Sequence, residues 1–376
     1  MEILVKDSIA RVADRSRREF LQTAMLAAGA SIVSLPALAR QSDRKLGVAL
    51  VGLGSLSTNQ IAPALQKTEH CRLAAIVTGT PAKAKAWSEK YSIAEKNIYN
   101  YGSFDRVADN PEIDVVYVVL PNSMHAEYTI RAARANKHVL CEKPMANSAK
   151  DCEAMIAACQ KANRKLAIGY RLHFEPHNLE AKRLGQEKVL GKLRAIEAGF
   201  GFVIGDPTQW RLKKALAGGG ALMDVGIYAL QGARYVSGEE PIEVVAVETK
   251  TDPIKFKEVD ETIYFTLRFP SGLLANCGTS YNAGFNRLWA GAEKGWFELS
   301  PAYSYGGIKG RMSGDKTISL PQVDQFASEM DDFALCIKNN KSSGVSGEEG
   351  LRDLRIIEAI YQSIASGKAV RLKAGG

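Results

Sequence analysis

The chain has 376 residues, of which 46% are hydrophobic and 24% charged, and it contains 33 glycines and 13 prolines. These values are ordinary for globular proteins and exclude collagen-like, intrinsically disordered and disulfide-scaffold chains, while the length predicts about two or three domains. The formal net charge of +8 is spread along the sequence without a basic tract, and no nucleic-acid-reading motif is present, so we expect no nucleic-acid partner.

The N-terminal segment, residues 1–39, is typical of an export signal. The pair Arg17-Arg18 precedes a short apolar run over 25–35, and the segment closes on Pro36-Ala37-Leu38-Ala39, an A-x-A pattern. These features in this order are typical of a twin-arginine signal peptide. The alternative is an amphipathic helix or membrane anchor, but the run is shorter than the roughly 20 residues a membrane span needs. We therefore expect recognition by the twin-arginine export machinery, cleavage, and a periplasmic mature protein without a membrane segment.

After Lys45, short β-branched runs alternate with helical stretches, which is the pattern of βαβ units around a parallel sheet. The expected strands are 46–51, 72–77, 114–120, 138–141 and 166–170. The expected helices begin near Thr58 or cover 82–91, 126–136 and 149–162. The sequence thus predicts an α/β Rossmann-like dinucleotide-binding domain over residues 40–168.

The second half, residues 169–376, has longer alternating runs that meet through turn signals. The expected strands are 193–202, 242–249, 261–269, 272–280 and 295–299. This pattern predicts an α+β domain for substrate binding and oligomerisation, built on a large, mostly antiparallel open sheet. The helices expected at 220–236, 325–339 and 348–366 should cover one face of this sheet. Loops near 201–216 and 280–288 should shape the substrate pocket.

Neither cysteine nor histidine spacing predicts a metal site. The six cysteines include no C-x-x-C, and a chain of this length needs no disulfide, so we expect buried free thiols. His173 and His177 are four residues apart, but Pro176 lies between them and no third ligand is near. We expect a structural role for both and no bound metal.

The first expected strand runs into a glycine-rich turn that opens a helix. Gly52 allows a tight turn and Gly54 a close approach of the backbone to a pyrophosphate, while backbone N–H groups point at the phosphates. The third position of G-x-G-x-x-G is Ser57, so the helix should pack slightly farther from the strand. The expected phosphate contacts are Gly52, Leu53, Gly54 and Leu56; the alternative is a tight β–α turn without a ligand.

The end of the second strand favours NADP over NAD. An NAD-specific site places Asp or Glu there to hold the ribose 2′-hydroxyl, whereas this strand ends in Thr78-Gly79-Thr80 and is followed by Lys83. A hydroxyl from Thr78 and the charge of Lys83 suit a 2′-phosphate. The alternative for Lys83 is a solvated helix face.

Three further segments carry candidate chemistry. Leu120-Pro121-Asn122-Ser123-Met124-His125 and Cys141-Glu142-Lys143-Pro144 follow strands of the parallel sheet, where ligands of such sheets bind. The third, G-G-G-x-L-x-D-x-G-x-Y over 218–228, places Asp224 and Tyr228 on one helix face. The alternatives are a helix-capping turn at E-K-P and an ordinary surface pair on the helix.

Together, G-x-G, P-N-x-x-H, E-K-P and the 218–228 motif resemble the oxidoreductase family of glucose–fructose oxidoreductase and the inositol dehydrogenases. The resemblance covers essentially the whole chain after residue 39. It is greatest to the glucose–fructose and aldose–aldose oxidoreductase branch, through Tyr101, Tyr170-Arg171, Trp210-Arg211 and 348–350, and through Tyr228 where many relatives have histidine. This branch implies export, a tightly bound, non-dissociating NADP, and a homodimer or homotetramer formed through the open sheet face.

The chemistry of sugar oxidation suggests roles for three residues. Oxidising a pyranose at C1 sends a hydride to the nicotinamide and removes a proton from O1, and a phenol with a pKa near 10 is a poor base unless an ammonium group stabilises the phenolate. Tyr228 is therefore the expected acid/base, Lys143 its neighbouring ammonium, and Asp224 a ligand for a sugar hydroxyl. The resemblance further implies cofactor contacts from Tyr101, Leu120, Pro121, Asn122, His125, Glu142, Lys143, Arg171, Trp210, Arg211 and Tyr305.

Export and a retained cofactor have a joint consequence, because the periplasm has no free NADP pool. The reduced cofactor must then be reoxidised in place by a second substrate. We expect a ping-pong cycle in which an aldose is oxidised to a lactone and a ketose or aldose is reduced to an alditol. The alternatives are a conventional, dissociable NAD(P)-dependent sugar or polyol dehydrogenase and a non-catalytic sugar-binding protein; intact Lys143, Asp224 and Tyr228 disfavour the latter.

Overall fold

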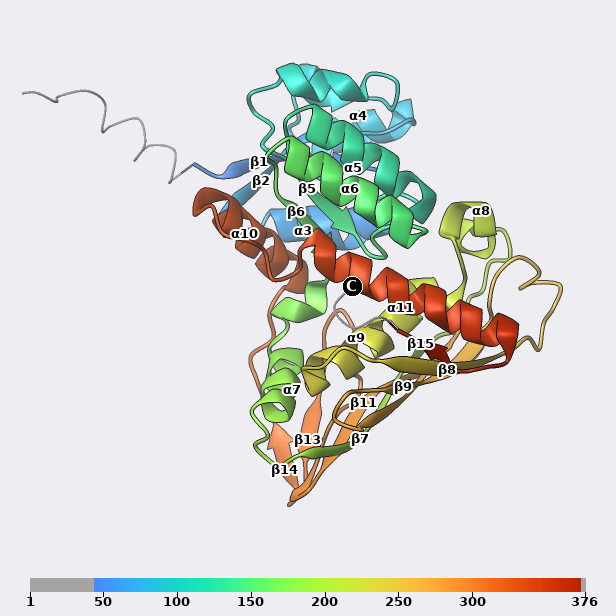
Figure 1. Cartoon of the computed structure of the whole chain (residues 1–376). Coiled ribbons are helices and arrows are strands. Elements are labelled where there is room, and N and C mark those ends of the chain that lie inside the picture. The colour runs from blue at the N-terminus through green and yellow to red at the C-terminus, as the bar shows by residue number, and fades with distance from the viewer. Residues whose placement is uncertain (1–43, 373–376) are drawn as a thin grey trace, which may run out of the picture. The chain divides into compact units, whose positions relative to one another are not determined.

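The computed structural model describes residues 44–372, and the predicted signal peptide, residues 1–39, lies outside them. Two sheets organise the described residues, one in the N-terminal half and one in the C-terminal half (Figure 1). Within residues 44–372, no helix has the length and apolar character that crossing a bilayer requires.

The first sheet has six parallel strands in the order β3-β2-β1-β4-β5-β6. The strands are β1 (Leu46–Val51), β2 (Cys71–Val77), β3 (Ile98–Tyr99), β4 (Val115–Val118), β5 (His138–Glu142) and β6 (Leu166–Gly169). The helices beside them are α3 (Ala62–Leu65), α4 (Pro81–Tyr91), α5 (His125–Arg134) and α6 (Ala149–Lys161). Every residue of β1 and β4 is buried, as expected for central strands covered on both faces. The chain reverses its direction of progress across the sheet between β1 and β4, where open α/β sheets bind their ligands.

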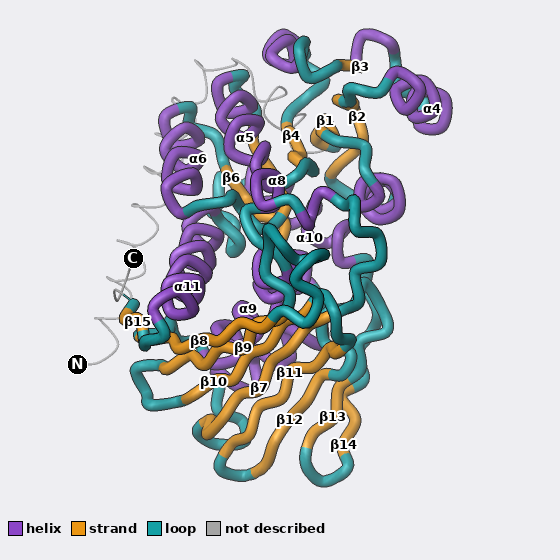
Figure 2. The backbone as a smooth tube through the Cα atoms, turned by 90° about the vertical axis from the view of Figure 1, so that its right-hand side faces the viewer, coloured by secondary structure: helices purple, strands orange, loops and turns teal. Residues whose placement is uncertain are grey.

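The second sheet has nine strands in the order β14-β13-β12-β11-β7-β10-β9-β8-β15, seen side by side in Figure 2. They are β7 (Leu193–Gly201), β8 (Glu243–Thr249), β9 (Thr262–Arg268), β10 (Leu274–Ser280), β11 (Phe285–Ala292), β12 (Gly295–Leu299), β13 (Gly310–Met312), β14 (Lys316–Ile318) and β15 (Val370–Arg371). Only the pairing of β7 with β10 is parallel. The predicted fold class, a Rossmann domain followed by a mostly antiparallel sheet with helices, is confirmed.

Several elements of the second half differ from the prediction. Residues from Phe285 onward form β11, which pairs with β7, so the prediction of a loop over 280–288 is wrong from that point. The helix α7 (Pro176–Gln186) was not predicted, because Pro176 suggests a helix break. Proline is tolerated in the first turn of a helix, and the Glu175 carboxylate caps this helix by accepting the Asn178 backbone N–H.

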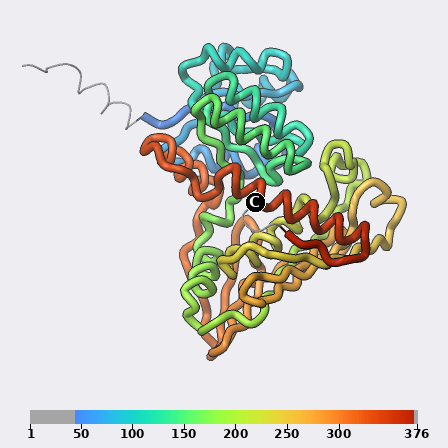
Figure 3. Tube along the Cα trace, viewed as in Figure 1, coloured from blue at the N-terminus to red at the C-terminus, as the bar shows by residue number. Residues whose placement is uncertain are grey.

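The helix α10 (Gln325–Lys338) packs against the first domain, so the prediction that it covers the second sheet is wrong. The Asp331 carboxylate accepts the backbone N–H groups of Glu69 and His70, at 2.8 and 2.7 Å, and so ties α10 to the start of β2. By contrast, α9 (Ile227–Ser237) packs on β7, β10 and β11 as expected. The long α11 (Gly347–Ser366) lies along both β8 and α6 and so joins the two sheets (Figure 3).

The six cysteines are free thiols, as predicted, and five of them are buried, whereas Cys336 is only half-buried. Burial raises the pKa of Cys71 to about 12, so this group stays a neutral thiol.

Candidate active site

A cleft of about 560 Å³ crosses the carboxyl ends of the parallel strands and continues to side chains of the second half. It contains every predicted cofactor-binding residue except His125. These are Gly52, Leu53, Gly54, Leu56, Thr78, Lys83, Tyr101, Leu120, Pro121, Asn122, Glu142, Lys143, Arg171, Trp210, Arg211 and Tyr305. The lining residues that the sequence did not reveal are Ser55, Gly79, Thr80, Val119 and Phe326.

The glycine-rich turn at one end of the cleft fits a dinucleotide phosphate. Gly52 has a φ of +91°, and a Cβ added there would lie 2.2 Å from the Val119 carbonyl oxygen, so no larger residue is accommodated. A Cβ on Gly54 would meet nothing within 4 Å, because this position opens toward the cleft. The Ser57 hydroxyl donates to the Gly52 carbonyl at 2.5 Å, at the start of a short π-helix (Ser57–Ile61). Serine thus takes the third position of the motif and binds the turn directly.

The residues that follow β2 form the wall where the ribose of a dinucleotide would lie. The Lys83 ammonium donates to the Leu53 carbonyl at 3.1 Å and therefore stays beside the glycine-rich turn. The Tyr101 ring lies against Gly79, where an added Cβ would come within 3.1 Å of it. Among the described residues, the carboxylates that line the cleft are Glu142 and Asp224, and both belong to its catalytic end.

Asp224 is the centre of a charged network at that catalytic end. The Lys143 ammonium donates to the Asp224 backbone carbonyl at 2.6 Å and to Oδ1 at 3.1 Å. Oδ2 accepts Nε of Arg211 at 3.0 Å and the Tyr281 hydroxyl at 2.9 Å. The carboxylate therefore holds two cations. Tyr281 lies in the segment predicted near 280–288, but no sequence pattern indicated its contact with Asp224.

The charges in this network stabilise one another. Burial alone would raise the pKa of Asp224, but Lys143 and Arg211 outweigh burial and lower it to about 2. Burial alone would likewise lower the pKa of Lys143, but the neighbouring Tyr228, Asp224 and Glu142 raise it. At neutral pH Lys143 is an ammonium group with two N–H bonds committed to Asp224, and its third donates to no described protein group.

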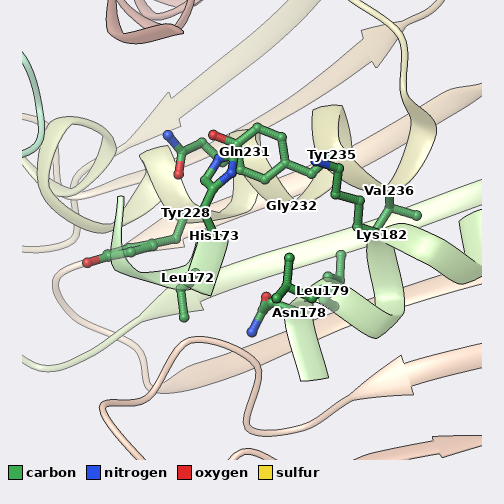
Figure 4. A pocket seen from close by; sticks show the side chains of 11 residues that line it. Leu172, His173, Asn178, Leu179, Lys182, Tyr228, Gln231, Gly232, Tyr235 and Val236 are labelled. Atoms are coloured by element: carbon green, nitrogen blue, oxygen red, sulfur yellow. The ribbon is translucent and has the colours of Figure 1, made fainter. Parts of the chain in front are cut away.

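Tyr228 presents its ring to two cations and its hydroxyl to the cleft. The Lys143 Nζ lies 4.9 Å and the Arg171 Cζ 5.0 Å from the ring centroid. Within residues 44–372, no hydrogen bond to the Tyr228 hydroxyl is formed, and the phenol oxygen points away from His173 and Tyr235 in the small cavity behind it (Figure 4). This hydroxyl is therefore available to a substrate in front of the ring.

A second cavity, of about 480 Å³, adjoins the cleft and shares Lys143, Asp224 and Tyr228 with it. Phe202, Gln209 and Asn286 come from the segments near 201–216 and 280–288 that were predicted to shape the substrate pocket. The side chains that the sequence did not reveal here are Phe200, Val225, Tyr303 and Ser304. Aromatic faces combined with a few amide and hydroxyl groups are typical of sites for small polar ligands. The shared wall places such a ligand directly against a dinucleotide in the cleft.

His125 does not line the cleft but joins two of its turns. Its side chain is buried, with Nδ1 at 2.9 Å from the Pro144 carbonyl oxygen and Nε2 at 2.9 Å from that of Leu120. It therefore fixes the turn after β4 to the turn that carries Lys143. His125 therefore supports the cleft by holding these two turns together.

His173 and His177, which are four residues apart in the sequence, contact separate parts of the fold. The Nδ1 atom of His177 lies 2.8 Å from the Glu175 carboxylate, whereas His173 packs edge-on against the Tyr235 ring. The part of the chain that the structure describes contains no cluster of three His, Cys, Asp or Glu side chains able to hold a metal ion. The absence of a metal cofactor stays a prediction.

Family models match almost the entire described chain. Residues 46–170 match the oxidoreductase family with an NAD-binding Rossmann fold, 178–298 the GFO/IDH/MocA C-terminal domain, and 316–372 the oxidoreductase family C-terminal alpha/beta domain. The chain belongs to the GFO/IDH/MocA oxidoreductase family. The predicted family is thereby confirmed, together with the prediction of an NAD(P)-dependent oxidoreductase.

Two members of the GFO/IDH/MocA family illustrate the similarity of this chain to known proteins in sequence and structure. The crystal structure of aldose-aldose oxidoreductase from Caulobacter crescentus, complexed with glycerol, is 50% identical and has a TM-score of 0.85, covering 88% of this chain and 100% of that chain. D-xylose 1-dehydrogenase [NADP(+)] of Haloarcula marismortui is 31% identical over 341 residues, covering 88% of this chain and 94% of its own.

Proposed function

We propose that this chain is an NADP-dependent sugar oxidoreductase of the aldose–aldose or glucose–fructose type. It oxidises an aldose at C1 to the lactone and then reduces a second sugar, a ketose or an aldose, to the alditol. The observation that carries this proposal is the shared wall of the two cavities. There Lys143, Asp224 and Tyr228 face both the cleft that begins at the glycine-rich turn and the adjoining sugar-sized cavity.

The side chains on this wall have distinct tasks. Tyr228, as a phenolate stabilised by Lys143 and Arg171, takes the proton from the sugar O1 and becomes the neutral phenol. The phenol then gives this proton to the second sugar, which restores the phenolate. Asp224 holds Lys143 and Arg211 in place, and the remaining N–H of Lys143 donates to the sugar oxygen. NADP supplies the acceptor and donor of the hydride.

Three observations support NADP as the cofactor and its retention through the cycle. Lys83 lies at the wall that follows β2, where no carboxylate repels a 2′-phosphate. Trp210 and Tyr305 line the cleft from the second half of the chain, so a bound dinucleotide is held from both domains. The Haloarcula relative is named for NADP(+).

Residues 1–39 support export to the periplasm by the twin-arginine route, which carries folded proteins. A retained cofactor then needs a second sugar for its reoxidation, and ping-pong turnover follows. The mature protein is further proposed to form a homodimer or homotetramer through the open face of the second sheet. Exposed side chains on neighbouring strands of that sheet, Val245, Val247 and Tyr264, support this surface.

Two-substrate kinetics without added nucleotide test this proposal. Desalted protein should convert glucose or xylose together with fructose into lactone and alditol, with parallel double-reciprocal plots. Turnover that appears only after NADP is added would favour the conventional dehydrogenase. No product under either condition would favour the sugar-binding protein.

A further inference from the structure

Two buried carboxyl groups, Glu142 at the catalytic end of the cleft and Glu329 on α10, are not used by the proposed reaction. Glu142 ends β5 and lines the cleft, yet its side chain is only 6% exposed. The Tyr117 hydroxyl donates to its Oε1 at 2.7 Å. Glu329, on the first turns of α10, is 1% exposed.

Glu329 is the unusual member of this pair. Among residues 44–372, neither of its carboxyl oxygens has a hydrogen-bond partner. Burial, and after it the nearby Glu142 carboxylate, raises the pKa of Glu329 well above its ordinary value. A buried carboxylate without partners is too costly to persist, so Glu329 is a neutral acid at neutral pH.

The charged groups around Glu142 and Glu329 favour a state with one negative charge on the two carboxyl groups. Arg171 and Asp332 face Glu329, while Tyr117, Lys143 and Arg171 face Glu142. Burial raises the pKa of Glu142, whereas the Tyr117 hydrogen bond and the two cations oppose burial. Arg171 forms no ion pair with either acid, because its guanidinium donates to the carbonyls of Tyr303 and Ser304 and to Gln325.

The position of Glu142 brings its charge close to the expected place of the nicotinamide ring. Glu142 precedes Lys143 in the chain and lines the same end of the cleft as Tyr228, where a nicotinamide must lie to exchange a hydride with a sugar. An oxidised nicotinamide ring carries a positive charge and a reduced ring carries none. A fixed negative charge beside the ring therefore stabilises the oxidised form.

We propose that Glu329 is protonated while Glu142 is ionised, and that the single negative charge, on Glu142, makes the enzyme bind NADP⁺ more tightly relative to NADPH. This holds only if NADP occupies the cleft as proposed above. Glu329 acts through Glu142: as a neutral acid it keeps the pair at one charge. In alkaline solution Glu329 ionises, and the preference for NADP⁺ rises further.

The ratio of the two dissociation constants tests this role. NADPH binding is measured by its fluorescence and NADP⁺ binding by displacement of NADPH, from neutral to alkaline pH. In the wild type, the preference for NADP⁺ should rise with pH. Glu142→Gln should reduce the preference at neutral pH by about tenfold. Glu329→Gln should leave the neutral value within about twofold, because it replaces one uncharged group by another, and should make the alkaline rise smaller than in the wild type.

The matched control is Glu348→Gln, because Glu348 is an exposed carboxylate on α11. This variant should behave as the wild type. A wild-type ratio that does not change with pH would overturn the proposal without recourse to any variant. An alkaline rise that is as large in Glu329→Gln as in the wild type would overturn it too.

Infrared spectroscopy tests whether Glu329 carries the proton, without sugar turnover. At neutral pH the wild type should show the carbonyl stretch of a protonated carboxylic acid, and the difference spectrum against Glu329→Gln should isolate it. If this band is unchanged in Glu329→Gln, Glu329 is not the protonated acid and the proposal fails. If the wild type shows the band and the predicted affinity ratio but turns over no sugar, the proposed function is contradicted and the role of Glu142 and Glu329 is not.

Discussion

Replacing Asp224 by asparagine removes the one negative charge that holds Lys143 and Arg211 together. The side chain keeps its size, and an amide oxygen still accepts one hydrogen bond. The donors of Lys143 and Arg211 lie 3.1 and 3.0 Å from the Asp224 carboxylate oxygens, and in the variant these two cations would face each other without this counter-charge. We expect the variant to lose stability and to change the titration of Lys143.

The pKa of Asp224 sets the size of the effect. The native structure lowers it from 3.8 to about 2, and each unit corresponds to about 1.4 kcal/mol, so the ionised form is stabilised by about 2 kcal/mol. A bare Coulomb attraction to Lys143 at 3.1 Å would amount to about 5 kcal/mol at an effective dielectric constant of about 20. Burial of the carboxylate opposes that attraction, so the smaller figure is the expected loss in the variant.

The pH dependence has a definite sign. Because the folded-state pKa is depressed, the stabilisation is complete above the unfolded value near 3.8 and is lost as the pH falls through about 2. Denaturant unfolding should therefore show a gap of about 2 kcal/mol between wild type and Asp224→Asn at neutral pH, narrowing below about pH 4. The pKa of Lys143 should fall, because Asp224 is one of the groups that raise it, and the alkaline limb of the pH–rate profile should shift down.

Glu293→Gln is the control for this experiment, because it breaks an exposed ion pair with Arg194 and should change little. Equal unfolding free energies for Asp224→Asn and wild type at neutral pH would refute the reasoning. A gap that stays constant into acid would refute it as well.

Three further substitutions test separate parts of the site. Tyr228→Phe should lower turnover by at least about a hundredfold while cofactor binding is retained, since only the proton-transferring hydroxyl is lost; unchanged turnover would exclude Tyr228 as the acid/base. Lys83→Ala should reduce the preference for NADP over NAD by about tenfold in binding titrations, and a preserved preference would place the 2′-phosphate elsewhere. Gly52→Ala should abolish cofactor binding, because its Cβ would overlap the Val119 carbonyl, and normal binding would show that this turn does not hold the phosphates.

The parallel sheet was predictable because its signals are local. β1 is a continuous apolar run followed at once by the glycine turn, and the P-N and E-K-P segments follow their strands directly. Since the carboxyl ends of parallel strands share one edge, these segments had to converge. The part of the cleft at the strand ends could therefore be assembled from local sequence patterns. The cofactor contacts of Tyr101, Arg171, Trp210, Arg211 and Tyr305 were implied by the family resemblance.

Phe202, Gln209 and Asn286 of the adjoining cavity lie in segments that were predicted to shape the substrate pocket. The rest of this cavity was not predictable because its residues come from elements far apart in the chain. Phe200 and Asn286 meet through the pairing of β7 with β11, and the sequence around Phe285 resembles a loop. The hydrogen bonds from Arg211 and Tyr281 to Asp224 were not predicted for the same reason, because these two residues reach it from separate segments of the chain. The place of α10 was also missed, because its contacts with Glu69 and His70 are tertiary and leave no periodic signal.

The central claim is that a retained nicotinamide cofactor is reduced by one sugar and reoxidised by another in the same site. The most direct measurement is an absorbance spectrum of the purified, desalted protein before and after adding glucose or xylose, and again after adding fructose. We predict that the near-ultraviolet band of reduced nicotinamide appears with the aldose and fades with the second sugar, without any added nucleotide. A spectrum that shows no such band until NADP is supplied would contradict the claim.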